Sequence, residues 1–157
     1  MQNHTLDAAS LKILDELQKN GRMSTAELAE KVGLSATPCW RRHKELEDSG
    51  YIVRYAAIAD RRKLGLMVCC HAHVTLNRHA AGVVEEFERA IMTRSEVVEC
   101  YETTGNSDYM IKVIVPDMEA YQAFLHEVLF KLAGIGQINT SVALREVKYE
   151  TAMPLRG

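Results

Sequence analysis

Apolar residues in the first third of the chain recur every three or four positions, a spacing typical of short amphipathic helices. The first such run extends from Leu11 to Leu17, after a candidate N-cap at Asp7. Asn20 and Gly21 follow it and predict the end of the helix, because glycine readily adopts the conformation that closes one.

Two further helices are predicted close behind, separated only by Gly33-Leu34. Ser24 and Glu27 have the spacing of a capping box, in which each side chain accepts a hydrogen bond from the other residue's backbone N–H. Ser35 begins the third helix, and Pro38 falls in its first turn, where a missing N–H is harmless.

The third helix is predicted to have one inward face. Cys39, His43 and Leu46 share it, which favours a core role for His43 over a switch. Residues 51–55 then alternate as in a strand and predict the start of a small wing.

The period changes after residues 59–65, which are the best candidate linker and carry three basic residues. Strands are predicted at 66–76, 97–104, 108–115 and 138–147, and helices at 80–92 and 118–132. This βαββαβ order predicts a ferredoxin-like α+β domain. We therefore expect a winged helix-turn-helix domain at 1–58, a linker at 59–65 and a ferredoxin-like domain at 66–157.

Charge is distributed unevenly between the two halves. The 157-residue chain has a net charge of −2, with eleven Lys/Arg against nine Asp/Glu in residues 1–63 and eight against twelve in residues 64–157. A mildly basic front and an acidic back favour a DNA-binding half joined to a half with another role. No apolar run approaches the ~20 residues of a membrane span, the polar start lacks a signal-peptide core, and the four cysteines show no disulfide framework. We expect a cytoplasmic protein.

Three helices with a very short glycine-containing turn between the second and third form the helix-turn-helix pattern. In such proteins the third helix enters the major groove of DNA, while the preceding helix braces against phosphates. A plain three-helix bundle with a solvated third helix is the alternative, and the pattern favours DNA binding. The candidate DNA-contacting residues are Thr25, Ser35, Ala36, Thr37, Pro38, Trp40, Arg41, Arg42 and Lys44.

Several motifs at fixed separations resemble those of the Lrp/AsnC (leucine-responsive, feast/famine) family of transcription regulators. The Ser-x-Thr-Pro-Cys stretch at 35–39 and the Gly-x-x-Asp-Tyr hairpin at 105–109 are specific in combination. The resemblance covers nearly the whole chain, through residues 5–7, 11–14, 20–22, 27–29, 32–35, 37–39, 46–52, 105–109, 115–118 and 146–148.

The resemblance implies a regulator of amino-acid metabolism that binds double-stranded DNA and a small amino-acid effector. It also implies dimers that pair through their sheets and assemble into tetramers or octamers. No catalytic residue, cofactor or resident metal is expected, and the protein is expected not to be an enzyme.

By the same resemblance, the effector site lies between subunits and is built from the hairpin and the last strand. Hydroxyls and backbone N–H groups would bind the α-carboxylate, and Asp108 the α-amine. From the residues alone, an ordinary turn in which Asp108 caps its own backbone is the alternative. The candidate effector-binding residues are Glu102, Thr103, Thr104, Gly105, Asn106, Ser107, Asp108, Met118, Ser141, Val142 and Ala143.

Two positions depart from the leucine-responding members of the family. Glu102 stands where they have an apolar residue, and Ser141 where they have a bulkier aromatic one, so leucine is disfavoured as the effector. Glu102 favours a polar or cationic amino acid, whereas residues 37–40 and 148–155 resemble a branch with a cysteine-responding regulator. Cysteine, lysine and asparagine all stay open.

Two other functions stay open as alternatives. Cys69, His71 and His73 share one strand face, where Cys and His could bind zinc or copper in a metal- or thiol-sensing regulator, although packing is the commoner role. Cys100 is a candidate redox thiol. Some tetrapyrrole decarboxylases resemble the same two-domain architecture, and His71, His73 and His79 keep that enzyme alternative open, while the recognition segment at 35–44 argues against it.

Overall fold

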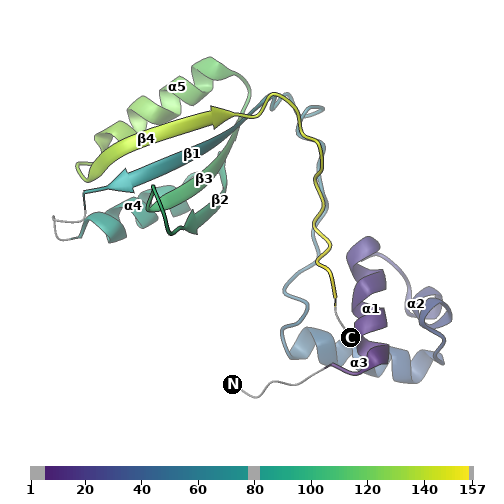
Figure 1. Cartoon of the computed structure of the whole chain (residues 1–157). Helices are drawn as coiled ribbons and strands as arrows, with labels where there is room; N and C mark the ends of the chain where they lie inside the picture. Colours follow the sequence, from purple (N-terminus) through teal and green to yellow (C-terminus); the bar gives the residue numbers. More distant parts are fainter. Residues whose placement is uncertain (1–5, 78–81, 156–157) are drawn as a thin grey trace. The chain divides into compact units, whose positions relative to one another are not determined.

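The computed structural model describes residues 6–77 and 82–155, which fall into two compact units (Figure 1). The first unit comprises residues 1–58 together with 148–157, and the second comprises residues 59–147. The sequence placed residues 148–157 with the C-terminal domain, whereas the described part of this tail groups with the N-terminal helices. The reason is a specific contact with the first helix, described below.

Three helices form the first unit: α1 (Ala8–Lys19), α2 (Thr25–Val32) and α3 (Ala36–Asp48). Their inward faces enclose one apolar core, because the apolar residues recur at helical spacing. The fully or nearly fully buried members of this core are Ile13, Leu17, Leu28, Ala29, Val32, Cys39 and Leu46.

The helix starts in this unit follow from local chemistry. The Asp7 carboxylate accepts the backbone N–H of Ser10 at 2.7 Å and caps α1. Ser24 and Glu27 form the predicted reciprocal capping box at the start of α2. Gly33 ends α2 with φ 72°, a left-handed conformation that favours glycine.

The wing strand predicted at residues 51–55 is wrong. These residues follow α3 as a bend and an extended segment, and none belongs to a strand. The N–H of Ile52 bonds back to Leu46 O at 3.1 Å. A strand needs a neighbouring strand to pair with, and the described residues of this unit supply none.

The described residues of the second unit form a four-stranded antiparallel sheet, two α-helices and one 3-10 helix. Its elements are β1 (Val68–Leu76), α4 (Val83–Met92), β2 (Val97–Glu102), β3 (Tyr109–Val115), α5 (Met118–Glu127), a short 3-10 helix η1 (Leu129–Lys131) and β4 (Ile135–Val142). The strand order is β2-β3-β1-β4, as expected for the predicted βαββαβ domain.

The last strand differs from its predicted range. β4 begins at Ile135 rather than 138 and ends at Val142 rather than 147. Beyond it, the N–H of Ala143 still bonds to Cys69 O at 2.9 Å. Because β4 runs antiparallel to β1 and β1 begins at Val68, the residues after Ala143 have no further strand residues to pair with. The predicted start of the α4 helix at residue 80 lies outside the described residues.

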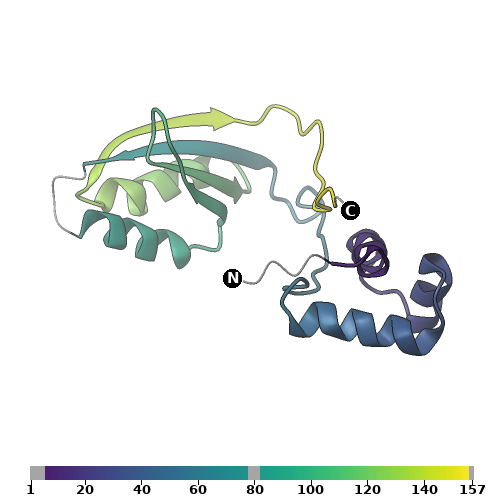
Figure 2. The same cartoon turned by 60° about the horizontal axis from the view of Figure 1, so that its bottom comes forward.

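Both α4 and α5 cover the same face of the sheet (Figure 2). Alternate residues of the central strands, including Ala72, Val74, Ile111 and Val113, point into the core beneath them. The opposite face, here called the open sheet face, carries the other set, and no described helix of this unit covers it. Its cross-strand neighbours include Cys69, His71 and His73 on β1, Met110, Lys112 and Ile114 on β3, and Asn139 and Ser141 on β4.

Within the described ranges, every helix falls short of the length and hydrophobicity that a membrane span requires.

Candidate functional site

The tight connection between α2 and α3 positions the candidate DNA-binding face. The N–H of Leu34 bonds to Ala29 O at 2.9 Å, so the chain folds back over the end of α2 before Ser35 starts α3. Ser35 is the N-cap residue, yet its side chain makes no capping bond, which leaves its exposed hydroxyl available at the start of α3.

One side of α3 is exposed and follows the spacing of a single helix face. Thr37, Trp40, Arg41 and Lys44 are all exposed, and Trp40 retains 56% of its surface. Ala36 is exposed beside them, whereas Pro38 and Thr25 are half-buried. The recognition segment therefore presents an aromatic ring, a hydroxyl and two cations together.

The two exposed cations of this face are held only by weak partners. Arg41 Nε lies 3.8 Å from Glu45 Oε1, and Lys44 Nζ lies 3.0 Å from Asp48 Oδ1. Exposed ion pairs within one helix contribute little to stability, because water screens the two charges. Both cations can therefore exchange these partners for phosphates or base edges.

Arg42, by contrast, turns away from the exposed face. Its guanidinium bonds to Asp7 Oδ2 at 3.1 Å, and its side chain is half-buried. It joins α3 to the N-cap of α1, which gives it a structural role in this chain even though the sequence included it among the DNA-contacting residues.

His43 is half-buried rather than part of the core, and its ring contacts Tyr55. Its Nε2 lies 2.5 Å from the Tyr55 hydroxyl, and that hydroxyl donates to Glu47 Oε1 at 3.2 Å. Burial, followed by the hydrogen bond to Glu47, raises the pKa of Tyr55 to about 12. These contacts attach the extended segment after α3 to the recognition helix.

The hairpin between β2 and β3 is the candidate effector site, and Asp108 braces it. Asp108 Oδ2 accepts the N–H of Leu76 at 2.7 Å, and its own N–H donates to Val74 O at 2.9 Å. Gly105, with φ 107°, makes the turn. Asp108 thus holds the hairpin on β1 by bonds to residues distant in sequence, a bracing role that differs from the local backbone cap considered from the sequence.

A hollow of about 450 Å³ lies beside this hairpin. Every residue lining it has a polar side chain: His73, Thr103, Thr104, Asn106, Ser107 and Asn139. Within it, His73 Nδ1 lies 3.4 Å from Ser107 Oγ, and the Thr103 hydroxyl donates to Ser107 O at 3.0 Å. These hydroxyl, amide and imidazole groups can form hydrogen bonds with a small ligand.

The sheet register separates the remaining candidate effector residues from the hairpin. Val142 pairs with Cys70 near the start of β1, whereas the hairpin is bonded to Val74 and Leu76 at its other end. Met118, which follows β3, and Ala143 also lie at the Cys70 end. One chain therefore does not bring Met118, Val142 and Ala143 to the hollow.

Glu102 and Ser141 point to opposite faces of the sheet. Glu102 pairs with the buried Tyr109 and so lies on the helix-covered side, outside the hollow. Ser141 pairs with His71 on the open sheet face.

Sequence reasoning missed His73 and Asn139 as residues of the hollow. They are direct neighbours across β1 and β4. The sequence indicated that His73 shares one strand face with Cys69. That Asn139 lies beside His73 follows only from the pairing of β1 with β4.

The described residues give little support to a metal- or thiol-sensing function. Cys69 Sγ and His71 Nε2 lie 3.9 Å apart, but within residues 6–77 and 82–155 no group of three Cys, His, Asp or Glu could hold a metal. Burial and then the Glu88 carboxylate raise the pKa of the Cys100 thiol, which disfavours its reactive thiolate. His79 lies outside the described residues.

Comparison with known families gives two matches in tandem. Residues 6–53 match the family described as winged helix-turn-helix DNA-binding, and residues 69–153 match the Lrp/AsnC ligand binding domain.

Individual proteins similar to the whole chain agree with these matches. The leucine-responsive regulatory protein of Escherichia coli K12 is 40% identical over 151 residues, which cover 96% of this chain and 92% of that protein. A transcriptional regulator of Neisseria meningitidis, solved in complex with L-Met, has a TM-score of 0.92 at 36% identity and covers 96% of this chain and 97% of its own. An AsnC family transcriptional regulator of Agrobacterium tumefaciens has a TM-score of 0.90 at 36% identity, with 95% and 97% covered.

Proposed function

The chain belongs to the Lrp/AsnC family of regulators, with a DNA-binding helix-turn-helix and an amino-acid-binding domain, and we propose that it couples the level of one polar amino acid to the expression of genes for amino-acid metabolism. It acts as a regulator rather than as an enzyme. Because its partner is chromosomal DNA, we place its action in the cytoplasm.

The observation that carries the DNA-binding part is the exposed face of α3. Thr37, Trp40, Arg41 and Lys44 lie on one side of a helix whose other side is fixed in the core. We propose that this face enters the major groove, with Ser35 and Ala36 at its leading end and Thr25 of α2 near the phosphates. Arg41 is suited to guanine edges, because its guanidinium can donate two parallel hydrogen bonds.

We propose the polar hollow beside the hairpin as the effector site. Its hydroxyls, amides and imidazole would bind a small amino acid whose own side chain forms hydrogen bonds. Among the described residues of one chain, no carboxylate lines the hollow, which disfavours lysine. Asparagine fits this lining best of the three amino acids that the sequence left open.

A second copy would complete this site. Met118, Val142 and Ala143 lie at the other end of the sheet from the hairpin, so they could join it only from another subunit. We propose that dimers form through the open sheet face and assemble further into tetramers or octamers. Binding between copies would let the effector shift the population of assembly states.

The DNA-binding part is tested by capturing fragments of the source genome on the purified protein and sequencing them. We expect discrete fragments to be enriched, with an affinity that falls steeply with salt because phosphate contacts release counterions. Arg41→Ala should weaken binding to those fragments by about 1–3 kcal/mol. Arg89→Ala, an exposed arginine of α4, is the matched control and should bind like the wild type. Equal binding by the Arg41 variant would refute the assigned face.

The effector part is tested by thermal shift of the same protein against each standard amino acid. A ligand that binds only the folded state raises Tm by mass action. We expect asparagine or another hydrogen-bonding amino acid to raise Tm, and His73→Ala to abolish the shift while His126→Ala on exposed α5 keeps it. A shift with leucine or methionine alone would overturn the proposed effector class but leave the regulator intact.

A further inference from the structure

The C-terminal tail of the chain returns to the DNA-binding unit after the last strand of the sheet. Residues 148–157 group with the helices of residues 1–58 and not with the sheet that precedes them. The stretch between is extended and unprotected, with Leu144 98% and Val147 82% exposed. Further along, Ala152 and Leu155 are half-buried, so side chains become shielded from solvent only within the tail.

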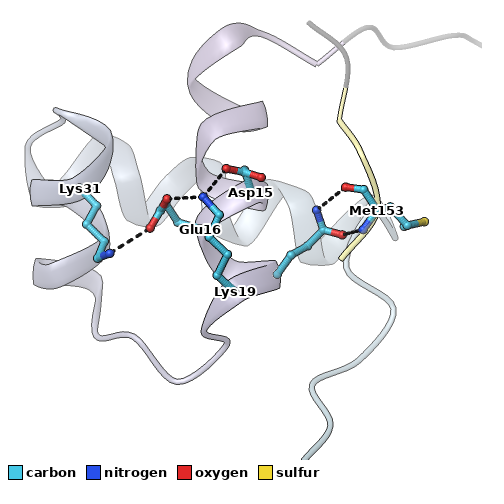
Figure 3. Close-up of polar contacts among 6 residues, drawn as sticks. Asp15, Glu16, Lys19, Lys31 and Met153 are labelled. Atoms are coloured by element: carbon cyan, nitrogen blue, oxygen red, sulfur yellow. Dashed lines mark hydrogen bonds and ion pairs between the residues drawn. The ribbon is translucent and has the colours of Figure 1, made fainter. Parts of the chain in front are cut away.

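One side chain of α1 holds the backbone of this tail from both sides. The Gln18 amide donates from Nε2 to Met153 O at 3.1 Å, and its Oε1 accepts the N–H of Met153 at 2.7 Å. Figure 3 shows Met153 beside α1 at this contact. A side-chain amide carries both a donor and an acceptor, so it can satisfy both backbone groups of one residue.

The charged neighbours of Gln18 are engaged with each other. Lys19 Nζ bonds to Asp15 at 2.6 Å and to Glu16 at 2.8 Å, and Lys31 Nζ bonds to Glu16 at 3.1 Å (Figure 3). The neutral amide is therefore the group of this helix surface that meets the tail.

Local hydrogen bonds order the tail just before it reaches Gln18. Glu150 Oε1 accepts the N–H groups of Thr151 at 3.0 Å and Ala152 at 3.1 Å, which fixes the backbone just ahead of Met153. Tyr149 and Thr151 line a groove of about 720 Å³ together with the end of α1 and the segment 54–58. The tail thus lies along the extended segment that leaves α3.

We propose that the α1 surface around Gln18 is a docking site for the chain's own C-terminal tail, and that the docked tail is a second connection through which the effector domain acts on the recognition helix. The covalent path is short: β4 carries Asn139 of the polar hollow, and the same chain continues directly to Met153. On the other side, α1 is tied to α3 by the Asp7–Arg42 pair at 3.1 Å. The coupling rests on the proposed function, whereas the docking itself does not.

The docking is tested by hydrogen–deuterium exchange in the full chain. We expect the tail peptide that contains Met153 to exchange slowly in the wild type and roughly tenfold faster in Gln18→Ala, which loses both hydrogen bonds. Gln18→Glu keeps the shape of the side chain but loses its N–H donor, so the tail should exchange faster than in the wild type in this variant too. Gln122→Ala, an exposed glutamine of α5, is the matched control. A tail that exchanges equally fast in the wild type and the Gln18 variants overturns the docking.

The coupling is tested by DNA affinity with and without an equimolar mixture of the standard L-amino acids. We expect a severalfold change in the wild type and nearly none in Gln18→Ala, with the affinity in buffer alone kept within about twofold because Gln18 lies outside the recognition face. A full response in a variant whose tail exchanges fast overturns the coupling. If the wild type does not respond at all, the proposed effector function fails together with the coupling, and the exchange result still decides the docking.

Discussion

Asp7 shows how much one side chain can organise in this protein. Its carboxylate caps α1 through Ser10 and also pairs with Arg42 of α3. The hydrogen bonds from Ser10, and then that from Arg42, lower the pKa of Asp7 to about 2. The start of the first helix and the position of the recognition helix therefore depend on the same ionised group.

Replacing Asp7 should destabilise the DNA-binding unit in a pH-dependent way. Because the pKa of Asp7 is lower in the folded state, its contribution is complete above the ordinary value of 3.8 and is lost as pH falls toward 2. We expect Asp7→Ala to lose about 0.5–2 kcal/mol of unfolding free energy at pH 7, as for other helix caps. Urea unfolding should show a smaller difference from the wild type at pH 3. A difference that stays constant with pH would contradict this role.

At the scale of elements, the sequence predicts helix starts well and strand ends poorly. The caps at Asp7 and Ser24 are local chemistry, and both formed as their spacing indicated. The end of β4 depends instead on where β1 begins, a contact distant in sequence. The strand expected at 51–55 failed for the same reason, because an alternating pattern cannot supply the partner strand.

Gly134 sets the distance between α4 and the turn that enters β4. A Cβ atom at this position would lie 2.1 Å from Val83 Cγ1, on the first residue of α4. We expect Gly134→Ala to destabilise the second unit by ~1–3 kcal/mol, the usual cost of overpacking.

The double variant Gly134→Ala, Val83→Ala tests the cause of that loss. Removing the two methyl groups takes away the contacts at 2.1 and 2.7 Å and leaves one of 2.9 Å to Val83 Cβ, so the glycine substitution should cost clearly less when it is measured against Val83→Ala alone by urea unfolding. An equal loss in both backgrounds would show that the close contact with Val83 is not the reason.

At the scale of the whole molecule, the open sheet face is the surface that most needs a partner. His71, Met110 and Ile114 are half-buried on it, and the helices α4 and α5 of the same unit lie on the other face. Sheets with one face uncovered usually pack it against another layer.

Ile114→Arg should therefore convert the protein to monomers. A charge in the middle of a packed apolar contact is costly to desolvate, and light scattering coupled to size-exclusion chromatography would report the mass directly. Gln122→Arg on exposed α5 is the control and should assemble normally. An Ile114 variant with the wild-type mass would place the interface elsewhere.

The candidate sites were predictable to different degrees. The exposure of Trp40, Arg41 and Lys44 follows from helical spacing and was predictable from the sequence, whereas their contact with DNA stays a prediction. The role of Asp108 in bracing β1, and the approach of Asn139 to His73, depend on cross-strand register. The return of the tail to Gln18 had no local signal, since it joins residues far apart in the chain.

This return gives the chain the topology of an inserted domain. The DNA-binding unit begins the polypeptide, is interrupted at residue 58 and resumes at 148. A fragment cut at the linker would therefore lack the extended tail segment that contacts Gln18 of α1. A fragment of residues 59–147 would by contrast keep its entire compact unit. The part that can be separated from this regulator intact is therefore the ligand-binding domain and not the DNA-binding unit.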